Sequence, residues 1–216
     1  MDFFSTDQTS LKICGVRTAA DAQDLIDLGV DAAGFNFWPH SKRYLDTKDA
    51  AWLKSLEGKI LRVGVFVNQP SELSLRLISD GMIDVVQLHG DEDTEAAAIF
   101  SDAGIRVIKA IGVKNPADIE RAGEFQVDAM LLDAHAPSVF GGTGETFDWS
   151  LALDFKTRFP NTAMILAGGI TPQNAAMAIS QVRPAALDIA SGAEVSPGVK
   201  DFTKVQQLLD ACRRAL

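Results

Sequence analysis

Ala167-Gly168-Gly169-Ile170 and Ala190-Ser191-Gly192-Ala193-Glu194 are the stretches that decide the fold of this chain. Each follows an apolar run typical of a buried strand, at 164–166 and 186–189, and each precedes a helical pattern. Glycine lets backbone N–H groups approach a ligand closely, and a helix start favours negative charge. In an eight-fold (β/α) barrel, phosphate commonly binds at the loops after strands 7 and 8. We therefore expect phosphate to bind at Gly168, Gly169, Ser191 and Gly192.

Upstream of these loops the chain repeats one pattern, in which a helical stretch ends in glycine and an apolar strand follows within a few residues. The glycines are Gly29, Gly58, Gly81, Gly104 and Gly123. Glycine often ends a helix in the left-handed conformation, and near-continuous apolar strands are typical of a parallel sheet covered on both faces. With Leu11–Cys14 in front and the strands before the two glycine loops, the repeat predicts an α/β fold, a single-domain (β/α)8 TIM barrel. A doubly wound open sheet is the alternative, although it usually carries a glycine fingerprint after strand 1, where this chain has Gly15.

Three of the expected helices carry start signals. Thr18 and Asp21 have the spacing of a capping box. Asn115-Pro116 and Thr171-Pro172 each place a capping side chain before proline, which favours the first position of a helix. We therefore expect helices to begin directly after residues 18, 115 and 171.

The composition suits one domain over residues 1–216, with residues 1–10 as an N-terminal extension. Hydrophobic residues make up 47% of the chain, and no linker or low-complexity tract divides it. The net charge of −9 argues against nucleic acid and membrane surfaces as partners, because phosphate backbones need a basic face. The N-terminus lacks the features of a secretory signal, and no apolar run is long enough to span a membrane. We expect a cytoplasmic protein.

The two cysteines, Cys14 and Cys212, are not expected to form a disulfide. In a barrel, Cys14 ends the first strand at one end, and Cys212 lies late in the last helix, which runs toward the other. Their separation would exceed the limit of roughly 7 Å between bridged Cα atoms.

Chemistry in a (β/α)8 barrel takes place at the carboxyl ends of the strands. Cys14 ends the first expected strand and Asp133 the sixth. A thiolate takes up a proton when its pKa is lowered toward neutrality, and a carboxylic acid in a dry pocket donates one. The two are a candidate base and acid. The plainer alternatives are a buried hydrophobic cysteine and an aspartate that caps a loop.

Three further side chains are expected near the same rim. His89 follows the fourth strand, Asp188 lies inside the eighth, and Arg43 has the planar fork that suits a carboxylate. A structural histidine and a surface cation are the alternatives for His89 and Arg43. The three histidines, which include His40 and His135, lack the spacing of metal ligands, so we expect no metal.

Residues 140–149 are a candidate lid. Three glycines give this segment mobility, and Phe147 and Trp149 give it aromatic side chains that could dock. The alternative is a flexible connector with Trp149 packed in the core.

Several motifs, in the expected order from residue 11 to about residue 201, together resemble the phosphoribosylanthranilate isomerase family. They are Lys12-Ile13-Cys14-Gly15, Gly34-Phe35-Asn36-Phe37 through Ser41-Lys42-Arg43-Tyr44, Val86-Gln87-Leu88-His89-Gly90, Leu132-Asp133, Gly141-Gly142-Thr143-Gly144 through Phe147-Asp148-Trp149, Ala167-Gly168-Gly169-Ile170, and Asp188-Ile189-Ala190-Ser191-Gly192 through Pro197-Gly198-Val199-Lys200-Asp201. The resemblance implies a cofactor-free step of tryptophan biosynthesis. In it, N-(5-phosphoribosyl)anthranilate becomes 1-(2-carboxyphenylamino)-1-deoxyribulose 5-phosphate by an Amadori rearrangement.

The same resemblance implies roles for the site residues. Asp133 would be the general acid that opens the furanose ring, and Cys14 the general base that removes the C2 proton. Arg43 would hold the anthranilate carboxylate and the glycine loops the phosphate, with His89 and Asp188 as further binding residues. The chain departs from the family pattern at Glu145, where a basic residue is frequent, and at His40, where lysine is frequent before Ser41.

Two other functions fit the glycine loops. Another phosphate-binding barrel enzyme, such as a sugar-phosphate epimerase, lyase or synthase, would need paired carboxylates, a Schiff-base lysine or a histidine-rich metal site at strands 1 and 6. A non-catalytic barrel that binds phosphorylated metabolites would need neither Cys14 nor Asp133. In every case we expect a small phosphorylated molecule as the partner, and a monomer or homodimer.

Overall fold

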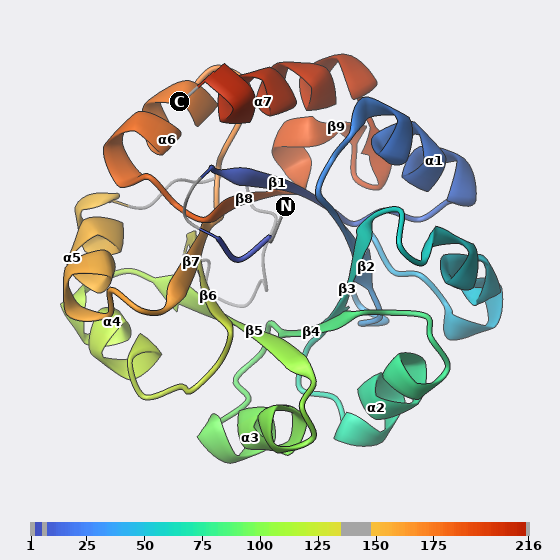
Figure 1. The fold of residues 1–216 in the computed structure, drawn as a ribbon, viewed down its shortest axis with the longest axis horizontal. Coiled ribbons are helices and arrows are strands. Elements are labelled where there is room, and N and C mark those ends of the chain that lie inside the picture. Colours follow the sequence, from blue (N-terminus) through green and yellow to red (C-terminus); the bar gives the residue numbers. More distant parts are fainter. Residues whose placement is uncertain (1–2, 6–7, 135–147, 215–216) are drawn as a thin grey trace.

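The computed structural model describes residues 3–5, 8–134 and 148–214. Eight parallel strands pair in chain order, and the first pairs with the last, so that the sheet closes into a barrel (Figure 1). The strands are β1 (Ser10–Cys14), β2 (Ala32–Asn36), β3 (Leu61–Phe66), β4 (Val85–Leu88), β5 (Arg106–Val113), β6 (Ala129–Ala134), β7 (Ala163–Leu166) and β8 (Ala186–Ile189). Lys12 of β1 lies opposite Asp188 of β8. This closure confirms the TIM barrel and excludes the open sheet.

Helices surround the barrel in Figure 1. They are α1 (Ala19–Leu28), α2 (Ser71–Ser79), α3 (Thr94–Asp102), α4 (Pro116–Ala122), α5 (Ser150–Arg158), α6 (Ala175–Val182) and α7 (Phe202–Arg214). Between β2 and β3 the repeat predicts a helical stretch, and the fully described chain there forms only two 3₁₀ helices, η1 (Thr47–Asp49) and η2 (Ala51–Leu56). Short segments of this kind suit the tighter helix. After β8 come the 3₁₀ turn η3 (Ser191–Ala193) and the hairpin strands β9 (Glu194–Ser196) and β10 (Val199–Lys200).

Two of the three predicted helix starts are correct. The Thr18 hydroxyl accepts a hydrogen bond from Asp21 N at 3.0 Å, and Asn115 caps α4 with a full capping box. The prediction at Thr171-Pro172 is wrong, because α6 begins only at Ala175. Asn174 turns its side chain back onto the preceding loop, where it accepts from Thr171 N and donates to Gly169 O. The residues after Thr171 therefore form a turn that supports the glycine loop.

The helix-ending glycines serve two different purposes. Gly29, Gly58, Gly81 and Gly104 have positive φ values, as the left-handed stop requires. Gly123 does not, since its φ is −72°. A Cβ at Gly123 would lie 2.0 Å from the ring of Phe159, so glycine is needed there for close packing between α4 and the end of α5.

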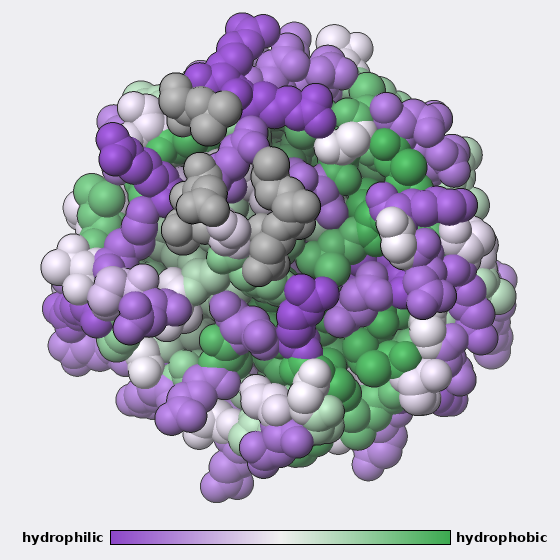
Figure 2. All heavy atoms as spheres, viewed as in Figure 1, coloured by the Kyte–Doolittle hydropathy of each residue, from purple (hydrophilic) through white to green (hydrophobic). Residues whose placement is uncertain are grey.

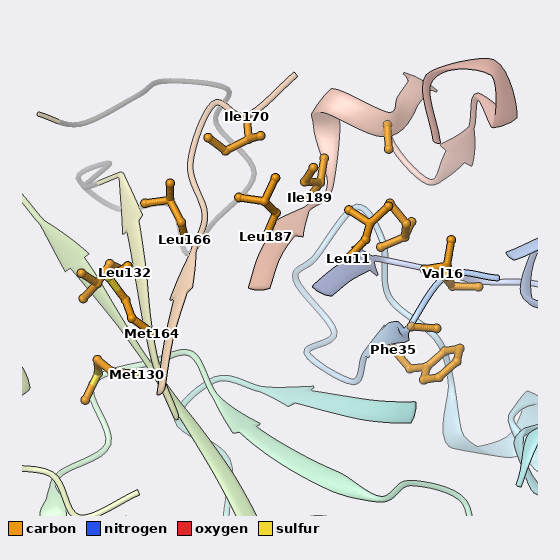
Figure 3. Close-up of a cluster of buried hydrophobic side chains, with 14 of the residues drawn as sticks. Leu11, Val16, Phe35, Met130, Leu132, Met164, Leu166, Ile170, Leu187 and Ile189 are labelled. Atoms are coloured by element: carbon orange, nitrogen blue, oxygen red, sulfur yellow. The ribbon is translucent and has the colours of Figure 1, made fainter. Parts of the chain in front are cut away.

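The core has two layers. The outer cluster lies between the barrel and the helices, and Figure 3 shows part of it, including Leu11, Leu132, Leu166 and Leu187. The inner cluster fills the barrel and includes the first residues of the even-numbered strands: Ala32, Val85, Ala129 and Ala186. Phe3 packs into this inner cluster with 5% of its surface exposed. The described part of the N-terminal segment therefore closes the barrel at the end where the strands begin, opposite the expected chemistry.

On the face shown in Figure 2, hydrophilic residues cover much of the helical ring, with hydrophobic residues showing between them. Among the described residues, no helix is long and apolar enough to cross a membrane.

Candidate active site

The carboxyl ends of the strands surround a cavity of about 360 Å³. This volume lies within the range of small-molecule sites. Every residue that the sequence predicts for the site lines this cavity: Cys14, Arg43, His89, Asp133, Gly168, Gly169, Asp188, Ser191 and Gly192. The fold brings these residues together, and their roles stay predictions.

Cys14 is the last residue of β1 and lines the cavity with a partly buried side chain. Burial raises the pKa of the Cys14 thiol above its ordinary value, and Asp188 adds to this rise. Three cations act in the opposite direction, namely Lys12, Lys200 and Arg43, of which Lys12 is the strongest. Because the thiolate is the form that takes up a proton, these cations control how readily Cys14 can act as a base.

Asp133 lies in β6 and is held from two sides. Its Oδ1 accepts a hydrogen bond from Ala134 N at 2.8 Å, and its Oδ2 lies 3.3 Å from His89 Nε2. The other ring nitrogen of His89, Nδ1, lies 2.8 Å from Nε2 of the buried Gln87. The Gln87 amide nitrogen can donate only, so this contact makes Nδ1 the acceptor and leaves Nε2 as the ring nitrogen that faces Asp133. The carboxyl group is thus oriented at the cavity wall.

Arg43 lies in the loop after β2 and is held by Glu194 at the start of β9. Arg43 Nε donates to Glu194 Oε1 at 2.8 Å, and Nη2 donates to Oε2 at 2.6 Å. Lys200 Nζ donates to the same carboxylate at 2.8 Å and also to the carbonyl of Cys14. A Cβ at Gly15, which has a φ of +77°, would lie 2.3 Å from Arg43 Cδ, so glycine is required where the arginine stem crosses the chain. The guanidinium is therefore fixed in position, and its hydrogen bonds to Glu194 use Nε and Nη2 but not Nη1.

The loops after β7 and β8 pack directly against each other. A Cβ at Gly192 would lie 1.9 Å from the carbonyl oxygen of Ile170. A Cβ at Gly168 would lie 2.9 Å from Asp133 Oδ1, so the first loop also approaches the candidate acid. Gly168 and Gly169 both have positive φ values, +79° and +62°. Glycine is thus needed in both loops, for close approach and for backbone conformation.

The backbone N–H groups of these loops are available to a ligand. Within the described part of the chain, no hydrogen bond uses the N–H of Gly168, Gly169, Ser191 or Gly192. All four residues line the cavity, and successive free N–H groups in such loops suit an anion.

Sequence reasoning missed four residues that organise the site: Lys12, Gln87, Glu194 and Lys200. Lys12 could have been found from strand alternation, since it shares the inward face of β1 with Cys14. Gln87 carries a similar signal, a polar residue in an apolar strand two residues before His89. Glu194 and Lys200 lie in a hairpin whose contacts with Arg43 and Cys14 no local pattern predicts.

Among the residues that the structure describes, no cluster of three or more His, Cys, Asp or Glu side chains is placed to hold a metal ion. Cys14 and Cys212 are both free thiols. Most of the candidate lid, residues 140–147, lies outside the described residues, as do Glu145 and His135. Trp149 is partly buried and packs against the outer core cluster.

The closed barrel and its rim cavity, with a thiol, a carboxyl group and two glycine loops, define the class of the protein: a (β/α)8-barrel enzyme for a small anionic ligand. A family model described as N-(5'-phosphoribosyl)anthranilate (PRA) isomerase matches residues 11–211. The chain belongs to this family. The resemblance predicted from the motifs is confirmed, and isomerase activity in tryptophan biosynthesis takes precedence over the two alternative functions.

Individual relatives agree. The chain is 42% identical over 200 residues to the N-(5'-phosphoribosyl)anthranilate isomerase of Thermotoga maritima, an alignment that covers 92% of this chain and 96% of the relative. A crystal structure of monomers generated from the dimeric Thermotoga maritima enzyme superimposes with a TM-score of 0.83 at 38% identity, covering 95% of this chain and 99% of that one. Another crystal structure, of an isomerase with reduced 1-(o-carboxyphenylamino)-1-deoxyribulose 5-phosphate, has a TM-score of 0.82 at 38% identity, with the same coverage.

Proposed function

We propose that this member of the isomerase family rearranges N-(5-phosphoribosyl)anthranilate with Cys14 as general base and Asp133 as general acid. The observation that carries the proposal is that both side chains line one cavity with the two glycine loops. One positioned acid and one positioned base, each worth roughly 10²–10⁴-fold in rate, suit a proton shift between neighbouring carbons.

The reaction needs two proton transfers by these residues. Asp133, in its acid form, protonates the furanose ring oxygen, and the C1–O bond breaks as the anthranilate nitrogen forms a C=N⁺ bond to C1. The Cys14 thiolate then takes the proton from C2, which leaves an enolamine. Gain of a proton at C1 and loss of one from the C2 hydroxyl gives 1-(2-carboxyphenylamino)-1-deoxyribulose 5-phosphate. Atoms and electrons balance without an oxidant or reductant.

Two anionic groups of the substrate fix its position. The N–H groups of Gly168, Gly169, Ser191 and Gly192, which no hydrogen bond among the described residues uses, suit the phosphate. The Nη1 side of Arg43 suits the anthranilate carboxylate, because Glu194 already holds the other edge of the guanidinium. His89 and Asp188, which line the same cavity, are proposed to bind the sugar portion or to orient the acid and base.

We further propose that the chain works in the cytoplasm as a monomer or homodimer. The dimeric state of the Thermotoga maritima relative supports the homodimer as one of these forms. Light scattering on the purified chain distinguishes the two: a mass near 23.2 kDa indicates the monomer, and twice this value the dimer.

The test is a fluorescence assay that follows consumption of N-(5-phosphoribosyl)anthranilate by the purified chain without added metal or nucleotide. We expect Asp133→Asn to abolish turnover while affinity for the reduced product analogue is largely kept. Cys14→Ser should lose several orders of magnitude in rate, since a hydroxyl is a far poorer base near pH 7. Cys212→Ala is the matched control and should keep full turnover. Near wild-type turnover in Asp133→Asn or Cys14→Ser would remove that residue from its proposed role.

A further inference from the structure

Lys12 occupies an unusual place for a lysine. It lies in the middle of β1, its side chain is fully buried, and its neighbours in sequence, Leu11 and Ile13, belong to the outer core cluster. Because side chains alternate along a strand, Lys12 points into the barrel on the same face as Cys14. A buried ammonium group is costly unless another charge compensates it. Hydrophobic packing alone therefore does not account for a lysine at this position.

Asp188 supplies the compensating charge. Lys12 Nζ donates to Asp188 Oδ1 at 2.8 Å across the seam between β1 and β8, and the exposed fractions of the two side chains are 0% and 6%. Burial alone would lower the pKa of Lys12, but Asp188 and Cys14 outweigh burial and raise the pKa above its ordinary value. Lys12 is thus a permanent cation inside the barrel.

The Cys14 sulfur lies close to the Lys12 ammonium. Both side chains flank the same backbone position, Gly34 on β2. A Cβ at Gly34 would lie 2.9 Å from Cys14 Sγ and 3.1 Å from Lys12 Nζ. A side chain at this position would therefore force the sulfur and the ammonium to move, and glycine keeps the space in which they meet.

We propose that Lys12 is a positioning residue for the proposed base: its ammonium, held by Asp188, lies beside the Cys14 sulfur at Gly34 and stabilises the thiolate that takes up the substrate proton. The inference rests on the proposed role of Cys14. The thiolate accepts the C2 proton and becomes a thiol, while Lys12 keeps its protons throughout. Asp188 then acts on the reaction by holding Lys12 in place.

The other charged groups that act on Cys14 are Asp188 from β8, Lys200 from β10 and Arg43 from the loop after β2. Lys200 and Arg43 share the Glu194 carboxylate, whereas Lys12 acts on the sulfur more strongly than either of them. Removing Lys12 should therefore leave Asp188 to disfavour the thiolate, with only the two weaker cations opposing it.

The test measures alkylation of Cys14 by iodoacetamide as a function of pH, with Cys14 and Cys212 followed on separate peptides by mass spectrometry. Lys12→Met keeps the length of the side chain and removes the charge. We expect the alkylation midpoint to move to higher pH, so that the rate at pH 7.5 falls about tenfold for each unit of the shift. Lys109→Met is the matched control, because Lys109 is also a buried strand lysine paired with a carboxylate, Glu92 at 2.8 Å, and it should leave the midpoint unchanged.

The pH profile of kcat/KM provides a second readout. The acidic limb of Lys12→Met should move upward with the alkylation midpoint, so that activity lost at pH 7.5 returns in part above pH 9. An unchanged alkylation midpoint overturns the inference. A shifted midpoint with an unmoved activity limb supports the effect of Lys12 on the Cys14 thiol and instead removes Cys14 as the base. If Lys12→Met does not fold, Lys12→Met/Asp188→Asn removes both charges, and its midpoint should still rise, since Lys12 is the stronger influence on Cys14.

Discussion

Replacing Glu194 with glutamine should destabilise the protein strongly, although Glu194 is neither the proposed acid nor the proposed base. Its carboxylate is the shared partner of Arg43 and Lys200 and also accepts from Gly198 N at 3.1 Å. The exposed fractions of the three charged side chains are only 12% for Arg43, 3% for Glu194 and 0% for Lys200. Glu194→Gln thus leaves two buried cations without a counter-charge.

The magnitude follows from the burial. Removing one partner of a buried ion pair costs about 3–5 kcal/mol. At about 2–4 °C per kcal/mol for a domain of this size, Tm should fall by about 6–20 °C. Asp154→Asn is the matched control, because its ion pair with Arg158 is 34–39% exposed and should contribute less than about 1 kcal/mol.

The effect should depend on pH with a definite sign. Burial tends to raise the pKa of Glu194, but hydrogen bonds and charge from Arg43 and Lys200 outweigh it and hold the pKa below its usual range. A carboxyl group with a lowered folded pKa stabilises the protein fully above its unfolded pKa, about 4.3, and loses this contribution as the pH falls through the folded pKa. The difference between wild type and Glu194→Gln should therefore be complete at pH 7 and shrink below about pH 4.

Urea unfolding of wild type, Glu194→Gln and Asp154→Asn across pH 3–8 measures the loss in free energy of unfolding and its dependence on pH. A deficit for Glu194→Gln no larger than that of Asp154→Asn at pH 7 would refute the reasoning. So would a deficit that stays constant down to pH 3.

Three further changes test separate parts of the molecule. Arg43→Ala should raise KM for N-(5-phosphoribosyl)anthranilate about 10–100-fold through loss of a charged hydrogen bond, with little change in inhibition by inorganic phosphate; equal weakening of both would mean that the carboxylate binds elsewhere. Gly192→Ala should weaken phosphate binding about tenfold or more in calorimetry, because its Cβ would lie 1.9 Å from Ile170 O and force the two loops apart; unchanged affinity would separate these loops from the phosphate site. Phe3→Ala should lower the free energy of unfolding by about 3–5 kcal/mol in urea and leave kcat unchanged, because Phe3 packs at the barrel end opposite the cavity; a loss of kcat in the folded variant would contradict this assignment.

Local sequence patterns predicted much of the fold. The alternation of helix, glycine and apolar strand depends on near neighbours in the chain, and it predicted five of the eight strands. The apolar runs at Leu11–Cys14 and before the two glycine loops predicted the other three. Periodicity did not distinguish the 3₁₀ helix η2 from an α-helix, because its buried residues Leu53 and Leu56 are three positions apart, a spacing that lies on one face of either helix. The start of α6 was misplaced since Asn174 hydrogen-bonds to a loop, a choice that Thr171-Pro172 does not reveal.

The features of the candidate site also divide into those that the sequence predicts and those that only the tertiary structure reveals. The sequence by itself determined which residues reach the rim of the barrel. In a (β/α)8 barrel the carboxyl ends of all strands lie at the same end of the molecule, so a residue at the end of a strand lies at this rim. Only the tertiary structure decided their charged partners: Arg43 meets Glu194 across 151 positions, and Lys12 meets Asp188 across 176. It also decided that Phe3 closes the inner core. Contacts between segments this far apart depend on barrel closure and on side-chain direction, and no local periodicity encodes either.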